Sequence, residues 1–223
     1  PSGDPTSVTD IAMYDRIEVV RGAAGLTQAN NEPGGTINAV RKKPTSKRQL
    51  SSDLTVNTWG KVGSTFDASG ALSPEHGLRG RFVGSVGSNK TFQDQSGGRD
   101  ILLYGVMDKD IGDNSKLTWG ASYLNQTKTP DPDGLPMRAD GKEWKRSRYL
   151  GADWNEARLK KHNLFAEFEH YFNDNWKLSS KLDWRKNTGS KEYYTLGGTD
   201  NGIGADGLGK TYSFDRYDTD SRQ

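Results

Sequence analysis

The side chains that could do chemistry in this sequence do not form a catalytic or metal-binding pattern. His76, His162 and His170 lack the spacing of metal ligands. Residues 202–207, GIGADG, match a dinucleotide-binding motif only in spelling, because no strand–turn–helix context surrounds them. Residues 131–134, DPDG, begin like a calcium loop that lacks its closing Glu. No nucleophile stands beside a base, so the sequence predicts that the protein is not an enzyme.

Aromatic and basic residues offer a different chemistry, and they gather in one long polar segment at 127–160. Trp144, Tyr149 and Trp154 lie in it with several arginines and lysines. A tyrosine pair at 193–194 is a weaker candidate. Aromatic faces beside cations suit an organic ligand that carries oxygen atoms. Any one of these aromatics could equally anchor the chain at a membrane interface.

The elements that position these residues are strands. From residue 49 onward, apolar and polar residues alternate over long stretches, which predicts seven strands and the start of an eighth. In the fourth of them Leu102, Tyr104 and Val106 make the second face apolar as well. The first 47 residues differ, with short strands predicted at 17–21 and 36–41 and a basic linker at 41–48.

Composition and loop lengths favour a membrane barrel. Apolar residues are only 31% of the chain, although it holds 6 Trp, 9 Tyr and 7 Phe. No run of 18 apolar residues could form a transmembrane helix. Tight turns alternate with long loops, as in transmembrane barrels, apart from a short link at 59–60. A soluble antiparallel sandwich is the alternative. The net charge of +2 gives no reason to expect nucleic acid as a partner.

Two stretches near the start carry a family resemblance. Residues 14–26 read YDRIEVVRGAAGL and residues 32–44 read EPGGTINAVRKKP. They resemble the end of the plug domain in TonB-dependent outer-membrane siderophore receptors, and most of all the ferric hydroxamate branch, which includes coprogen, rhodotorulic acid and pyoverdine receptors. The resemblance implies an all-β transmembrane fold, in which residues 1–47 end the plug and residues 48–223 begin a barrel of about 22 strands.

The resemblance also implies roles for motif residues. Arg16, Glu18 and Arg21 match family positions that form ion pairs between plug and barrel, although a solvated strand face is the simpler alternative. Residues 26–28, namely Leu26, Thr27 and Gln28, belong to the family's apical plug loop, which faces the ligand. Trp144, Tyr149 and Trp154 are expected to complete the ligand shell from the outer loop.

The function implied is uptake of a ferric siderophore of the hydroxamate type across the outer membrane of a Gram-negative cell. No cofactor is expected, and no direct ligation of iron by the protein, because the siderophore already surrounds the metal. The expected partners are the siderophore, the TonB–ExbB–ExbD complex, and outer-membrane lipid or lipopolysaccharide. Uptake of haem or cobalamin, or a small structural barrel, are the alternatives. The ends of the chain suggest an internal piece of a longer receptor.

Overall fold

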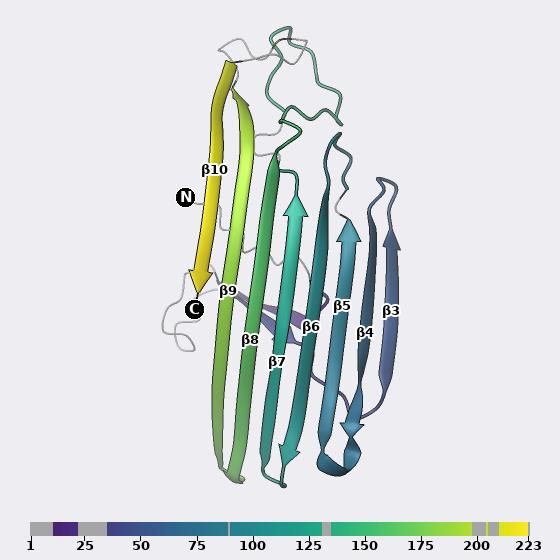
Figure 1. Ribbon diagram of the computed structural model, residues 1–223, viewed down its shortest axis with the longest axis vertical. Coiled ribbons are helices and arrows are strands. Elements are labelled where there is room, and N and C mark those ends of the chain that lie inside the picture. Colours follow the sequence, from purple (N-terminus) through teal and green to yellow (C-terminus); the bar gives the residue numbers. More distant parts are fainter. Residues whose placement is uncertain are drawn as a thin grey trace.

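The computed structural model describes residues 11–21, 35–88, 90–130, 135–197, 204 and 210–222, without the side chains of 21, 35, 36, 195–197 and 210–213. Strands dominate this part of the chain, and they form two separate antiparallel sheets (Figure 1). The smaller sheet is a hairpin of β1 (Tyr14–Arg21) and β2 (Gly35–Arg41). The two short strands predicted near the start are therefore confirmed, and each is slightly longer than expected.

The larger sheet holds eight strands in sequence order, each antiparallel to the next. Its strands are β3 (Gln49–Val56), β4 (Val62–Ser73), β5 (Leu78–Ser88), β6 (Gly98–Ile111), β7 (Ser115–Lys128), β8 (Glu156–Asn173), β9 (Trp176–Gly197) and β10 (Lys210–Arg222). An all-β architecture of successive antiparallel strands is confirmed, and the start of an eighth strand that the sequence predicted is a full strand of 13 residues, β10.

The sheet has two chemically different faces, because side chains of a strand alternate between them. One face, which we call the apolar face, carries Leu54, Phe82, Leu103, Leu164 and Trp184. These side chains are 43–73% exposed in this chain. Their positions follow one another across the strand register, for example Leu164 opposite Trp184. The apolar face is thus one continuous surface.

The opposite face, which we call the hairpin face, carries the hairpin (Figure 1). It bears most of the strand charges, yet its centre is apolar, with Val83, Tyr104 and Val106 at 0–3% exposure. This explains why β6 is apolar on both sides. Its odd-numbered residues reach the apolar face, while Tyr104 and its even-numbered neighbours pack beneath the hairpin.

Connections are short at one end of the sheet and longer at the other (Figure 1). The short ones include a 3-10 turn at Pro74–His76, closed by Gly77 with a positive φ of 62° that favours glycine. The longest connection is shorter than the predicted 127–160, because β7 continues to Lys128 and β8 begins at Glu156. Among the described residues, no helix has both the length and the apolar character needed to cross a membrane.

Candidate functional site

The hairpin is held to the sheet by basic residues at the end of its second strand and directly after it. Arg41, the last residue of β2, donates from Nη2 to Asn163 Oδ1 at 2.9 Å and to Asp183 Oδ2 at 3.1 Å. Its guanidinium also lies over the ring of Phe165, 4.3 Å from the centroid. A single side chain thus joins the hairpin to β8 and β9 by charge, hydrogen bonding and cation–π contact.

Lys42 makes the second connection, to a strand nearer the β3 edge of the large sheet. Its Nζ lies 2.8 Å from Asp67 Oδ2 on β4. Asp67 also accepts two hydrogen bonds from Arg81, at 2.8 and 2.7 Å. The main chain takes part too, since Tyr104 donates its hydroxyl hydrogen to the Lys42 carbonyl at 2.7 Å and Arg81 donates to the Lys43 carbonyl at 3.1 Å. These bonds fix the path of the chain between the two sheets.

Apolar packing supports these polar contacts. Val83, Tyr104 and Val106 form the buried centre of the sheet, and Met13 and Phe165 pack against it. The rings of Tyr104 and Phe165 are stacked, with 6.4 Å between centroids. Met13 comes from the turn that leads into β1, so the hairpin is held both before its first strand and after its second.

Each carboxylate that receives the hairpin also has a partner within the sheet. Asp67 keeps Arg81, and Asp183 keeps Arg185, whose Nε lies 2.5 Å from Asp183 Oδ1. A buried carboxylate that loses its only cation is costly. Here neither Asp67 nor Asp183 would be left unpaired if Arg41 and Lys42 withdrew.

Arg16, Glu18 and Arg21 are the residues expected to form ion pairs between plug and barrel. Among the described side chains, neither Arg16 nor Glu18 forms an ion pair with the large sheet. Arg16 donates to Glu18 at 2.6 Å and to Asp15 at 3.3 Å, all within β1. Glu18 also accepts from Asn38 of β2 at 2.9 Å. The bond from Arg16, followed by that from Asn38, lowers the pKa of Glu18. The side chain of Arg21 lies outside the described residues, so plug–barrel pairing by this trio stays a prediction.

Sequence reasoning missed Arg41 and Lys42 by assigning residues 41–48 to a linker. A usable signal was present. Three consecutive basic residues begin at the last position of β2, while Asp67 and Asp183 occupy the polar side of two predicted strands. What the sequence does not contain is the placement of these distant segments side by side.

Three of the predicted ligand residues lie near the start of the chain and three lie in the long loop between β7 and β8. Leu26, Thr27 and Gln28 lie outside the described residues. Tyr149, from the long loop, is only 8% exposed, and its hydroxyl donates to the Pro130 carbonyl at 3.1 Å. That hydroxyl also accepts from Asn155 Nδ2 at 2.9 Å. Tyr149 therefore contributes to the interior of the loop.

Trp144 is likewise engaged within the loop. Its Nε1 donates to the Pro136 carbonyl at 2.7 Å, and Arg138 lies over its ring at 4.9 Å. Arg138 in turn pairs with Asp140 at 2.6 Å. Trp144 is half-buried, so part of its ring remains open to solvent.

Trp154 is the exposed member of the three, at 46%. It meets the rings of Tyr194 and Phe214 edge to face, with centroids 6.5 and 5.4 Å apart. Tyr194 and Phe214 are opposite one another in the register and alternate with the same side as Trp184. The cluster of Trp154, Tyr194 and Phe214 is therefore associated with the apolar face of the sheet.

A second aromatic group lies on the hairpin face. Tyr193 stacks on Tyr217 with 6.2 Å between centroids, and Lys191 Nζ lies 4.0 Å from the Tyr193 centroid. Tyr217 is 56% exposed. Its pairing with Lys191 places the group nearer the long-loop end than Asp183, where Arg41 is bound. This arrangement can stack an aromatic group and attract a negative one. Among the described residues, no cluster of three metal-ligating side chains occurs.

Comparison with known proteins relates this chain to siderophore receptors. No protein-family model matches the chain. It is similar to the ferric-pyoverdine M114 receptor PbuA of Pseudomonas sp. strain M114, at 33% identity over 94% of this chain and 26% of the relative. The ferric-pyoverdine BN7/BN8 receptor of Pseudomonas putida is also 33% identical, over 83% of this chain and 24% of the relative. The chain thus spans about a quarter of the length of the curated relatives it matches.

Solved structures agree with these relatives. The crystal structure of the ferripyoverdine receptor of the outer membrane of Pseudomonas aeruginosa, bound to ferripyoverdine, matches with a TM-score of 0.79 and 30% identity. The match covers 85% of this chain and 26% of that one. A complex of FpvAI with pyocin S2 matches with a TM-score of 0.80 and 29% identity, over 85% of this chain and 26% of that one. The relatives are receptors, none of them described as an enzyme.

Proposed function

Because this chain belongs to the TonB-dependent siderophore receptors, we propose that it forms the part of such a receptor in which the plug meets the barrel wall. The hairpin and its basic end would complete the plug, with residues 1–47 as the plug portion. The large sheet, within residues 48–223, would form successive strands of the wall.

The ligand we propose is a ferric siderophore, with a ferric pyoverdine as the first candidate. This rests on the relatives named as ferric-pyoverdine receptors. Such a ligand keeps iron inside its own oxygen shell, so the receptor needs aromatic faces and cations instead of metal ligands. Within this chain Trp144 remains a candidate on the outer loop, together with Leu26, Thr27 and Gln28, while Tyr149 would act by shaping the loop. Trp154 packs with Tyr194 and Phe214 on the side of the apolar face, so it would instead act at the membrane boundary.

The location we propose is the outer membrane, with the apolar face toward lipid and the long loops outside. The apolar face is a broad exposed surface, and contact between such a surface and water is unfavourable. At its short-turn end stand Phe172 and Trp176, which are 62% and 72% exposed. Aromatic residues at the edge of an apolar band are typical of barrels at the membrane boundary.

One observation carries the proposal, namely that Arg41 and Lys42 bind the hairpin to charged residues of the hairpin face, while the opposite face of the sheet is apolar. A plug inside a lipid-embedded wall requires this combination. Because Asp67 and Asp183 each keep a second cation, the plug could withdraw and return without leaving either of them unpaired. We propose that TonB, together with ExbB and ExbD, supplies the energy for that movement.

The test uses the full-length receptor that contains this segment. Its binding of a ferric pyoverdine, ferric coprogen, haem and cyanocobalamin is measured by quenching of tryptophan fluorescence in detergent. Uptake of radioactive iron is then followed in cells with and without TonB. Binding of a ferric siderophore and uptake that requires TonB are expected. Binding of haem or cobalamin alone would replace the siderophore by another ligand, and uptake unaffected by loss of TonB would contradict the mechanism.

A further inference from the structure

Two kinds of contact join the hairpin to the large sheet, and they differ in what remains when they break. The side chains of Arg41 and Lys42 end on carboxylates that each keep a second cation within the sheet. These side-chain contacts can therefore open without leaving a buried charge unpaired. The main chain that follows β2 makes contacts of the second kind, because its own amide and carbonyl groups are bonded to side chains of the sheet.

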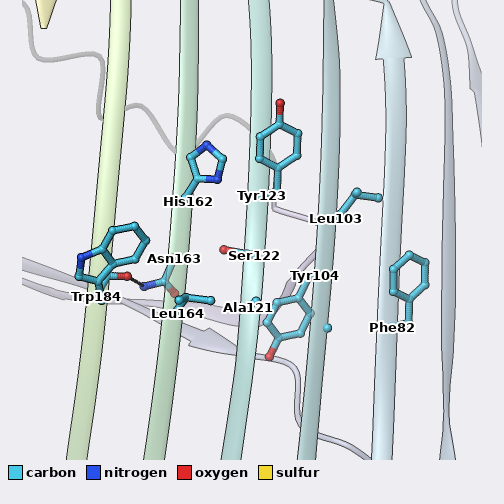
Figure 2. Close-up of a pocket in the computed structure, with 11 residues that line it drawn as sticks. Phe82, Leu103, Tyr104, Ala121, Ser122, Tyr123, His162, Asn163, Leu164 and Trp184 are labelled. Atoms are coloured by element: carbon cyan, nitrogen blue, oxygen red, sulfur yellow. Dashed lines mark hydrogen bonds between the residues drawn. The ribbon is translucent and has the colours of Figure 1, made fainter. Parts of the chain in front are cut away.

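The carbonyl groups of Lys42 and Lys43 are the first of these main-chain contacts. The Lys42 carbonyl accepts a hydrogen bond from the Tyr104 hydroxyl at 2.7 Å, and Tyr104 is only 1% exposed. Figure 2 shows Tyr104 on β6. The Lys43 carbonyl accepts from Arg81 of β5 at 3.1 Å. Detachment of Lys42 would leave the buried Tyr104 hydroxyl without its acceptor, and an unpaired buried polar group is costly.

Further along, the chain is bound closely to β4. The amide of Thr45 donates to the Ser69 hydroxyl oxygen at 2.9 Å, and the Thr45 hydroxyl oxygen lies 2.9 Å from the same atom. Ser69 is only 7% exposed, so this contact is shielded from water. A Cβ atom added to Gly70 would lie 3.3 Å from Arg48 Cα, which shows how closely the two backbones approach there. Residues 45–48 are thus fixed to the wall before β3 begins.

Lys42 is the junction between the hairpin and this fixed segment. Its amide donates to the Met13 carbonyl at 3.0 Å, before β1, while its carbonyl accepts from Tyr104 of the sheet. Pro44 follows two residues later, and its ring fixes φ and restricts the backbone of the residue before it. The chain is therefore stiff beyond Lys42. A backbone rotation at Lys42 is the change that would turn the hairpin while the bonds of residues 43–48 stay intact.

We propose that Lys42 is the pivot about which the hairpin moves during transport. The side chains of Arg41 and Lys42 would leave the wall, while residues 43–48 remain bound to β4 and β5 throughout. The moving part of the plug would then end at residue 41, before the boundary at residue 47 that the sequence suggested. The inference rests on the receptor function proposed above and adds the point about which its plug turns.

The test locks the chain on either side of the pivot in the full-length receptor, since this segment contains no cysteine that would compete. Thr45→Cys with Ser69→Cys places two sulfur atoms where oxygen atoms stand 2.9 Å apart, so a disulfide should form. Arg41→Cys with Asn163→Cys, the latter on β8 in Figure 2, is bridged by a short bismaleimide in place of the side-chain contact. Peptide mass spectrometry verifies each link, and uptake of radioactive iron from a ferric pyoverdine is measured in cells.

The disulfide should leave the rate of uptake unchanged, because it joins parts that stay together. The bismaleimide bridge should abolish uptake, because it holds the hairpin to the wall. The controls are the disulfide variant after reduction and the Arg41→Cys, Asn163→Cys variant capped with N-ethylmaleimide, which modifies both thiols without joining them. Loss of uptake with the disulfide, restored by reduction, would overturn the fixed segment, and uptake through the bridged receptor would overturn the moving hairpin.

Binding of the ferric pyoverdine and its TonB-dependent uptake are also measured on the unaltered receptor. Their absence there would be a failure of the receptor function. Their presence, with either contrary result in the locked variants, would be a failure of the pivot alone.

Discussion

Arg41 concentrates much of the hairpin's attachment in one side chain. It reaches Asn163, Asp183 and the ring of Phe165 from the end of β2. Arg41→Ala should lower the free energy of unfolding by roughly 1–3 kcal/mol, because it removes charged hydrogen bonds that are partly shielded from water. It should also speed amide hydrogen exchange in β2, measured by mass spectrometry on the full-length receptor.

Arg16→Ala is the matched control for that change, since the ion pairs of Arg16 with Asp15 and Glu18 lie within β1. A loss below about 0.5 kcal/mol is expected, as for other exposed ion pairs. If Arg16→Ala loosened the hairpin as much as Arg41→Ala, Arg16 would have a partner on the barrel wall, as the family motif first suggested.

Asp140 in the long loop provides a prediction that depends on pH. Hydrogen bonds from Arg138 at 2.8 and 2.6 Å hold the pKa of Asp140 at about 2. A carboxyl whose pKa is lowered on folding stabilises the folded state at pH values above its ordinary pKa. This stabilisation is lost as the pH falls through the pKa of the folded state. The contact should therefore persist until the pH approaches 2. Carbon NMR of aspartate-labelled receptor should show this titration.

The variant Arg138→Gln should return the pKa of Asp140 toward about 3.9, the ordinary value for aspartate. Asp140→Asn identifies the signal by removing it. A midpoint near 3.9 in the unaltered protein would show that the Arg138 contact does not form in solution.

At the level of single residues, sequence reasoning found the right kinds of side chain but not all their roles. Tyr149 and Trp144 were chosen as ligand contacts because they are aromatic and lie in a long loop. The structure engages the polar atoms of both with loop carbonyls. Alternation could have predicted that Tyr193 and Tyr194 face opposite sides. It could not show which side the hairpin occupies, because that depends on contacts between residues more than 100 positions apart.

Where strands of the large sheet approach each other closely, only a small side chain fits between them. A Cβ atom added to Gly120 of β7 would lie 2.5 Å from the Gly105 carbonyl oxygen and 2.6 Å from Phe165 Cζ. Gly120→Ala should destabilise the receptor by about 1–3 kcal/mol, because the ring and the backbone must both shift. Thermal unfolding followed by circular dichroism measures this loss.

Gly105→Ala is a close control, one strand away, where an added Cβ meets nothing within 4 Å. It should leave the unfolding temperature nearly unchanged. Equal loss in the two variants would mean that glycine flexibility, not the close approach at Gly120, determines the cost.

Elements were the most predictable scale of this molecule. Period-two alternation located seven strands of the large sheet and the start of the eighth, and the tight turns were visible as clusters of Pro, Gly, Asn and Asp. The long loop was overestimated at both ends, because β7 and β8 continue as polar strands beyond the apolar band. Polar strand ends lack the alternation that identifies a strand, so sequence reasoning assigned them to the loop.

At the scale of the whole molecule, the two edge strands of the large sheet determine how the chain should behave in isolation. In the described part of the chain, β3 and β10 each pair on one side only, and the sheet between them has a wide apolar face. Unpaired strand edges readily add strands from other molecules. Residues 1–223 produced alone in detergent should therefore associate, giving a molar mass above that of one chain in size-exclusion chromatography with light scattering. The full-length receptor in the same detergent is the control, since a closed barrel pairs every edge. A single monomeric species of the short chain, with its strand content intact, would show that β3 and β10 are protected by means other than barrel closure.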